Sequence, residues 1–393
     1  MKQKRRIILF LVLFLSFLMF VIDPETGAAQ SRPNQLRSYL KQGIDKIFNM
    51  DNQSANIALQ KAVELDREDP MGYAFLALAH LVFYEMSFNQ RDREKNQEYM
   101  LRYVNDTLTM GEKRIEKNSK DSPAYFAMAL AKISKLRWAI TQKEYFTVTR
   151  EASSIWDYLE RANDADPQNY DIYFIRGMLH YHLDHLSSVI RFFSSLLITS
   201  GDRRKGLQEL ELVAKRGNLL KDLAQAELSQ IYMNFEKQPT RALPIIRGLR
   251  DKYPRNYNLS FALANTLSDL NQFKEAFAVA REIEKGIQSG VAPFVPQLQP
   301  RYEQLIGRIL FSQGEYAKAA EYFQMALKDT SFYNARVRVW AFVRLGMIHD
   351  IRKEREQAED YYFKALHVEG GEGTAQVEAR QYLKTPYVPP RKP

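Results

Sequence analysis

Residues with very small side chains recur along this 393-residue chain at fixed intervals. The stretches Gly43 to Ala62, Gly307 to Ala326 and Gly346 to Ala365 each advance by 19 positions, although they lie near opposite ends of the chain. Between them, Ala242 is followed by Ala276 after 34 positions. A period of this length is typical of stacked helical hairpins, each of which buries its apolar face only against a neighbour. The spacing therefore predicts an all-α array that grows by adding hairpins.

The composition narrows the chemistry that such an array can perform. Apolar residues make up 45% of the chain and charged residues 26%, which is ordinary for a folded protein. The absence of cysteine excludes disulfides, thiolate metal sites and cysteine nucleophiles. The sequence has no phosphate-binding glycine loop, zincin motif or nucleophile elbow. We therefore expect no catalytic residues and no cofactor.

The first 29 residues have the layout of an export signal. A basic head, Lys2 to Arg6, precedes the apolar run Ile7 to Ile22, and Gly27 to Ala29 offers small residues for cleavage. As a helix the run would span ~24 Å, which is short for a hydrocarbon core of ~30 Å. Two interpretations stay open, a cleaved signal peptide and a retained N-terminal anchor. Both predict an exported protein, periplasmic or associated with the cell envelope, that meets the membrane only through residues 7–22 if these are uncleaved.

The rest of the chain divides by composition into five parts. After a linker at 30–35, residues 36–290 continue the hairpin pattern, with an irregular insertion near 184–205 where a long helix and an extra helix are both consistent with the sequence. Three prolines make 291–300 a rigid connector. Residues 301–383 hold the last hairpins and a capping helix, which the end of a solenoid needs for solubility. The tail 384–393 is basic, proline-rich and expected to be disordered.

The repeat resembles the tetratricopeptide repeat, or TPR. In the unit at 300–333 the small and aromatic consensus positions are Gly307, Ala319, Phe323 and Ala326. In the unit at 339–372 they include Gly346, Ala358, Tyr362 and Ala365, and Pro254 closes an earlier unit. The resemblance implies a right-handed α-solenoid of about eight hairpins, of the type found in exported bacterial proteins, with a C-terminal capping helix.

The same resemblance suggests where a partner would bind. In TPR proteins the first helix of each hairpin lines a concave groove that receives an extended peptide or a partner helix. Mapped onto this chain, the groove residues expected on this basis are Asn258, Phe261, Asn265, Arg301, Gln304, Arg308, Phe311, Trp340 and Met347. For the three apolar residues in the repeat core, Phe261, Phe311 and Trp340, packing between repeats explains the sequence equally well.

Some relatives bind C-terminal carboxylates through five Lys, Asn and Arg positions. In this chain only Asn265 and Arg344 match that set, and Phe261, Leu305 and Trp340 occupy the other positions. The sequence therefore does not predict this form of recognition.

One cluster offers an alternative chemistry. Three of the six histidines fall between His180 and His185, where His180 and Asp184 share a helix face, as do His182 and His185. Imidazole and carboxylate are ordinary zinc ligands, so a metal-dependent binder or enzyme is a second interpretation. The simpler interpretation is that these histidines pack at the end of a helix and bind no metal.

The leading prediction is a non-catalytic scaffold that binds a protein partner in its concave groove, outside the cytoplasm. The net charge of +9 falls to +7 without residues 1–29, and a solvated surface is the simpler explanation of it; the other is attraction to anionic partners such as acidic proteins, cell-wall polymers or lipid headgroups. An acidic or extended protein segment is therefore one partner that the sequence allows, and no nucleic-acid partner is expected. A membrane-anchored structural spacer is a third interpretation, favoured if residues 7–22 remain attached.

Overall fold

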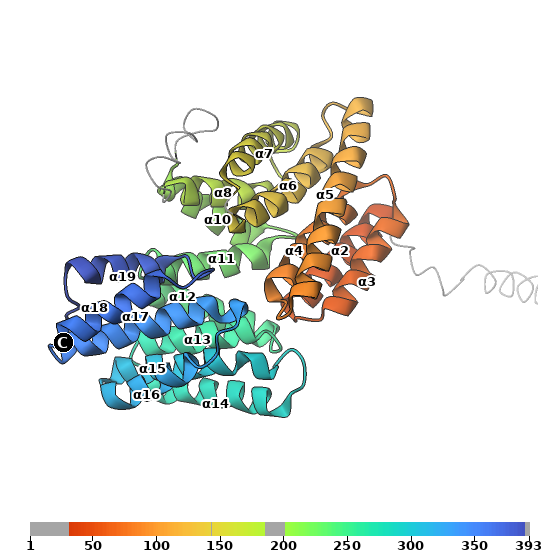
Figure 1. Ribbon diagram of the computed structural model, residues 1–393. Helices are drawn as coiled ribbons and strands as arrows, with labels where there is room; N and C mark the ends of the chain where they lie inside the picture. Colours follow the sequence, from red (N-terminus) through yellow and green to blue (C-terminus); the bar gives the residue numbers. More distant parts are fainter. Residues whose placement is uncertain (1–30, 143, 185–200, 390–393) are drawn as a thin grey trace, which may run out of the picture.

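The computed structural model describes residues 31–142, 144–184 and 201–389, and every regular element in these ranges is helical (Figure 1). Consecutive helices pack as antiparallel pairs, and eight such hairpins are present in the described ranges. The hairpins are α2 (Arg32–Phe48) with α3 (Asn52–Leu65), α4 (Pro70–Met86) with α5 (Gln90–Lys117), α6 (Ser122–Thr141) with α7 (Tyr145–Ala165), α8 (Ile172–Asp184) with α10 (Arg203–Arg216), α11 (Lys221–Asn234) with α12 (Pro239–Lys252), α13 (Tyr257–Asp269) with α14 (Phe273–Ser289), α15 (Gln299–Gln313) with α16 (Tyr316–Ala326), and α17 (Ala335–Ile351) with α18 (Arg355–Leu366).

The expected all-α solenoid of about eight hairpins is confirmed. A last helix, α19 (Thr374–Lys384), packs on α18 and α17 where the capping helix was expected. At the irregular insertion, α8 is described as far as Asp184 and α10 begins at Arg203, so the choice between a long helix and an extra helix falls on residues outside the described ones. Residues 185–200, in the centre of the insertion, lie outside the described residues, as do the N-terminal segment 1–29 and residues 390–393.

Two boundaries differ from the expected ones. The connector ends early, because the short 3₁₀ turn η1 (Pro296–Leu298) leads directly into α15. Pro300 lies in the first turn of α15, where a missing N–H costs no hydrogen bond. The buried core also continues past the connector as far as Ile309.

The tail is the second difference, because residues 385–389 are placed against the last repeats. Tyr387 donates its backbone N–H to Asp350 over 2.8 Å and stacks edge-on against Tyr382. Because the Tyr387 ring packs against Tyr382 and Phe311, this part of the tail is ordered and not disordered as expected.

The small residues lie where the two helices of a hairpin cross. A Cβ atom added to Gly307 would come within 2.6 Å of the Phe323 ring, and one added to Gly346 would come within 2.5 Å of the Tyr362 ring. A Cβ atom added to Gly43 would come within 2.4 Å of the Leu59 side chain. Real side chains do not approach this closely, so glycine lets the backbone of the first helix rest on a large side chain of the second. The steric argument made from the sequence is confirmed at these positions.

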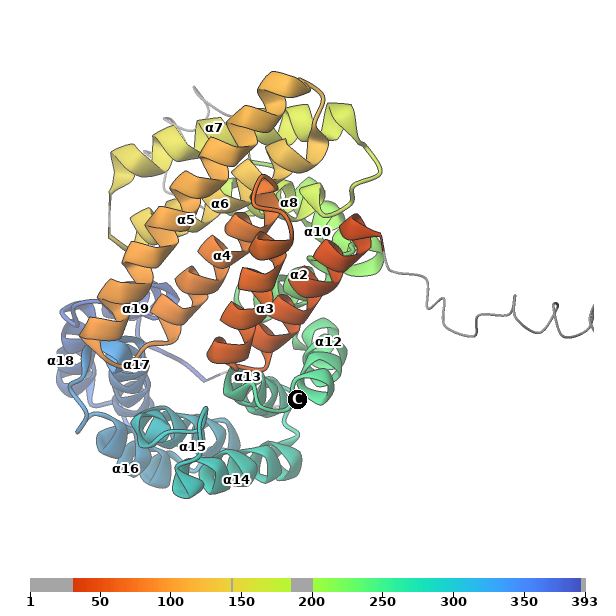
Figure 2. The same cartoon turned by 90° about the vertical axis from the view of Figure 1, so that its right-hand side faces the viewer.

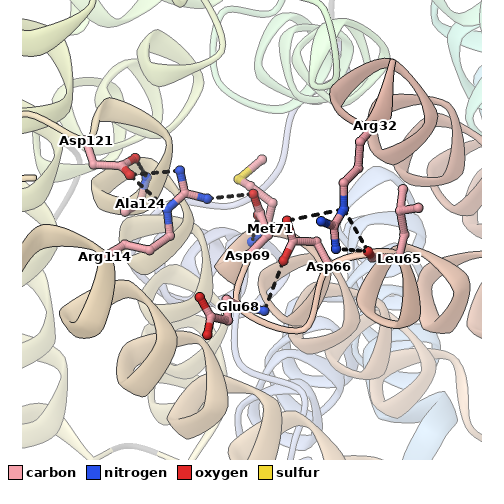
Figure 3. A network of polar contacts seen from close by, with 9 residues as sticks. All are labelled: Arg32, Leu65, Asp66, Glu68, Asp69, Met71, Arg114, Asp121 and Ala124. Carbon is pink, nitrogen blue, oxygen red and sulfur yellow. Dashed lines mark hydrogen bonds and ion pairs between the residues drawn. The ribbon is translucent and has the colours of Figure 1, made fainter. Parts of the chain in front are cut away.

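Polar residues hold the second and third hairpins in register (Figure 3). Asp69 and Asp121 cap the N-termini of α4 and α6 by accepting the backbone N–H groups of Met71 and Ala124. Arg114 on α5 reaches both caps, with guanidinium nitrogens 2.7 Å from Asp69 and 2.8 Å from Asp121. One arginine therefore joins the starts of two successive first helices.

Replacing Arg114 with alanine is expected to lower the free energy of unfolding by about 1–3 kcal/mol, because it leaves two largely buried carboxylates without their charged partner. Thermal and urea unfolding followed by circular dichroism measure the change. The matched control is Lys117→Ala on the same helix, whose ion pair with Glu68 spans 3.5 Å between exposed side chains and is expected to contribute little. Equal losses in the two variants would contradict a special role for the bridge.

Candidate functional site: a central cavity

The array of hairpins curves until its beginning meets its later repeats. The end of α2 and the α12–α13 loop are in direct contact, since the rings of Phe48 and Tyr253 stack at a centroid distance of 4.8 Å. Figure 2 shows the ends of α2 and α3 near α12 and α13, and a ring contact between Phe88 and Tyr333 brings the turn before α17 to the end of α4. The curved wall borders a central, partly open cavity of about 870 Å³, within the ~300–1,000 Å³ range of ligand sites.

The polar side of the cavity comes from the first helices of three successive hairpins, α13, α15 and α17. Amide side chains dominate on α13 and at the start of α15, where Asn258, Asn265 and Gln304 line the space. Amides can donate to and accept from a peptide backbone at the same time. This side of the cavity is therefore suited to an extended polypeptide.

Arg301 is a cavity cation that has no carboxylate partner among the described residues. Its Nη1 donates to the side-chain oxygen of Asn258 over 2.6 Å, and its guanidinium lies 4.2 Å from the ring centroid of Phe261. No carboxylate of the described residues forms an ion pair with it. Arg301 is partly buried, and this burial lowers the pKa of its guanidinium. An uncompensated cation in such a place favours an anionic ligand.

The other arginines of the cavity mostly have partners. Arg308 donates to both carboxylate oxygens of Asp269 at 2.7 and 2.8 Å. Arg137 does the same to Glu85 at 2.8 and 2.9 Å. These two bidentate pairs are electrically neutral, which leaves Arg301 and the exposed Arg336 as the cavity arginines without a carboxylate partner among the described residues.

A further arginine, Arg344, lies one helical turn beyond the cavity wall on α17. It stacks between the rings of Phe311 and Trp340 at 5.1 and 5.5 Å. Burial, with the nearby positive charge of Arg308 as the next cause, lowers the pKa of Arg344. The Nε atoms of Arg308 and Arg344 are both buried without a hydrogen-bond partner. The region around α15 and α17 is therefore rich in positive charge and in unused hydrogen-bonding capacity.

Six of the nine groove residues expected from the sequence line the cavity. They are Asn258, Asn265, Arg301, Gln304, Arg308 and Trp340. The other three, Phe261, Phe311 and Met347, are at most 7% exposed and belong to the core. For Phe261 and Phe311 this is the packing role that the sequence left open, and both rings support an arginine from below. These three residues do not line the cavity, and arginine side chains lie over or beside them.

Sequence reasoning missed the opposite wall. The first two hairpins contribute an apolar side that includes Ile44, Phe48, Leu78 and Val82. These residues are ordinary core-type positions in the repeat pattern, and nothing in the spacing indicates that the first repeats meet the fifth and sixth. Only the closure of the array brings them opposite Arg301.

The histidine cluster does not converge on one point. His180 is buried and its Nδ1 lies 2.6 Å from Glu209, whereas His182 Nε2 lies 2.7 Å from Glu227. His185 lies outside the described residues. Among the residues that the structure describes, no group of three or more histidine, aspartate and glutamate side chains is arranged to hold a metal ion. The two placed histidines therefore serve separate carboxylate contacts.

None of the described helices combines the length and the apolar character needed to cross a bilayer.

A curved array of helical hairpins around a polar, arginine-containing cavity defines a class of binding scaffold. A family model for the tetratricopeptide repeat matches residues 305–334, which contain the expected positions Gly307, Ala319, Phe323 and Ala326. The chain is also 26% identical over 195 residues to the TPR repeat-containing protein YpiA of Bacillus subtilis. That similarity covers 43% of this chain and 44% of the Bacillus protein, less than half the length of either.

Solved structures with similar folds are more distant. Human IFIT1, solved as a dimer with m7Gppp-AAAA, is 14% identical over 91% of this chain and 85% of its own, with a TM-score of 0.45. A tetratricopeptide repeat protein from Parabacteroides merdae is 16% identical over 75% of this chain and 93% of its own, with a TM-score of 0.29. At TM-scores this low, neither structure bears on what this chain binds.

The repeated hairpins, the matched family model and the Bacillus relative agree that the chain contains tetratricopeptide repeats and is similar to TPR proteins. Such repeats make it a protein-interaction scaffold.

Proposed function

We propose that this protein is a non-catalytic scaffold that holds an acidic, extended segment of another protein in its central cavity, outside the cytoplasm. The observation that carries the proposal is Arg301, a partly buried cation without a carboxylate partner among the described residues. A guanidinium has five N–H donors, and the contact with Asn258 uses one of them. A glutamate or aspartate of the partner would provide the missing anion, in a charge-assisted pair that can be bidentate.

The amides beside Arg301 explain why the ligand is a polypeptide. Asn258, Asn265 and Gln304 follow the curve of α13 and α15, so that an extended chain lying across these helices meets one amide after another. The side-chain oxygen of Asn265 is buried without a hydrogen-bond partner, and a backbone N–H would satisfy it. The apolar wall from α2 and α4 then covers the other face of the segment.

The proposed location outside the cytoplasm is supported by the basic head and the apolar run at 7–22. N-terminal sequencing of the protein purified from its native cell tests this part. A mature chain that begins near residue 30 agrees with a cleaved signal, and a chain that retains residues 7–22 in the membrane fraction agrees with an anchor. An intact chain recovered in the soluble cytoplasmic fraction would contradict export.

Binding is tested by recovering partners from the envelope fraction with the tagged wild type and with an Arg301→Ala/Arg308→Ala variant. We expect the variant to recover far less of the same partner, because both cavity cations are gone. The control is Arg352→Ala/Arg380→Ala, which removes two exposed arginines, one directly after α17 and one on α19, and gives the same net charge as the cavity variant. Equal recovery by all three proteins would reject the cavity as the binding site.

A further inference from the structure

Two narrow lines of contact close the array around its cavity. The first seam joins the end of α2 to the α12–α13 loop, 208 positions further along the chain. Asn256 Nδ2 donates to the backbone oxygen of Phe48 over 2.8 Å. The Tyr253 hydroxyl lies 2.7 Å from a carboxylate oxygen of Asp45 and 2.5 Å from one of Asp222, and the two carboxylates share its single proton. Lys252 Nζ lies 3.7 Å from the same Asp45 carboxylate. These contacts hold the first hairpin against the fifth and sixth.

The second seam joins the second hairpin to the turn before α17, η2 (Phe332–Asn334). The rings of Phe88 and Tyr333 meet edge to face at a centroid distance of 5.2 Å. The guanidinium of Arg93 lies over the Phe332 ring at 5.1 Å. Phe332 remains 47% exposed, so this seam is thin and borders solvent.

Both seams are built differently from the contacts between consecutive hairpins. Neighbouring hairpins share a continuous buried core that runs from Leu40 to Ile309. The apolar part of the first seam is instead a small cluster around Tyr253, linked to the main core through Phe48, and its ion pair joins side chains that are 51% and 52% exposed. Exposed pairs of this kind contribute little to stability. The array can therefore separate at its seams while every hairpin stays folded.

Separation at the seams would open the cavity directly. Phe48 and Asn256 of the first seam line the cavity, and so do Phe88 and Tyr333 of the second. The shape of a solenoid results from a small rotation at each repeat, so that modest changes spread over several hairpins suffice to part the seams. No single hinge is required.

We propose that the two N-terminal hairpins, α2 to α5, form a lid that opens at the two seams to admit a ligand to the central cavity and then closes over it. The identity of the ligand, an acidic polypeptide segment, rests on the proposed function. The proposed opening of the seams does not rest on the proposed function, because it is argued from the position and the exposure of the seam contacts.

The natural absence of cysteine allows the opening to be measured without a ligand. Arg91→Cys and Thr330→Cys place spin labels at exposed positions on opposite sides of the second seam. We expect pulsed electron spin resonance to show mainly short distances, and Phe88→Ala/Tyr333→Ala in the same background to increase a longer-distance population at least about threefold. The control Phe363→Ala removes an exposed ring away from both seams. A distance distribution that is unchanged by the seam variant would overturn the lid.

A second experiment locks the lid and needs no destabilised variant. Oxidised Phe88→Cys/Tyr333→Cys, or the same pair joined by a short bismaleimide, is expected to bind a fluorescent poly-glutamate decamer at least about tenfold more slowly than the reduced protein. Equal association rates in the locked and reduced forms would refute the lid. If the spin labels show opening but the decamer binds neither form, the lid stands and the proposed acidic ligand fails.

Discussion

Replacing Phe323 with alanine is expected to lower the free energy of unfolding of the last repeats by about 3–5 kcal/mol, the range for emptying a buried aromatic site. Phe323 is fully buried on α16, and its ring lies directly against the backbone of α15 at Gly307. The space left by the ring cannot be refilled by α15, because a glycine has no side chain to move into it. Urea unfolding followed by circular dichroism and by hydrogen exchange in α15 and α16 measures the effect.

The matched control is Met325→Ala, two positions further on the same helix, where the side chain is 40% exposed. We expect this variant to change stability by less than about 1 kcal/mol, since surface substitutions away from special features do little. A loss at Met325 as large as the loss at Phe323 would mean that the helix crossing described here is not what holds the repeat together.

Arg308→Met is expected to lower the stability and Arg301→Met is not, although both residues lie on α15 and line the cavity. Arg308 is paired with Asp269, so its loss strands a carboxylate and is expected to cost about 1–3 kcal/mol of stability. Arg301 has no such partner, and methionine keeps the packing on Phe261 while removing a partly buried charge. We therefore expect Arg301→Met to leave the stability unchanged or to raise it.

For the acidic ligand, Arg301→Met is expected to weaken binding by about 2–5 kcal/mol, which is about thirtyfold or more in the dissociation constant, because it removes one side of a partly buried charge pair. Isothermal titration with a poly-glutamate decamer and thermal unfolding of the same samples measure both quantities. A variant that loses stability but binds normally would show that Arg301 is retained for folding rather than for a ligand.

The hairpins could be predicted from the sequence because the positions that determine them are local. Gly307 and Phe323 lie on adjacent helices of one hairpin, and the side chain at each position must fit a neighbour only 16 residues away. The same holds for Gly346 and Tyr362. A periodic sequence therefore reports how each hairpin is built and where the next one begins.

The closure of the array could not be predicted in this way. Contact between Phe48 and Tyr253 depends on the rotations of all the intervening repeats, and the long α5 and the insertion near 184–205 alter those rotations. The sequence consequently placed one wall of the binding site and missed the wall formed by α2 and α4.

On α13, only some of the residues expected in the groove line the cavity. Asn258 and Asn265 are two turns apart on α13 and both reach the cavity, whereas Phe261 between them turns under Arg301 of the next hairpin. A modest rotation of α13 about its axis decides which of these residues faces the ligand. That rotation is set by packing against α15, and the repeat spacing does not record it.

The most direct test of the account is photocrosslinking in the native cell from inside the cavity. A p-benzoylphenylalanine at position 304, which lines the cavity, is compared with the same group at position 321, which is exposed on α16. Mass spectrometry of the products identifies the segment that each position touches. If the cavity binds an acidic segment, we expect position 304 to capture an acidic stretch of another protein and position 321 not to capture it. Products from position 304 that are absent, or that contain only neutral or basic stretches, would contradict it.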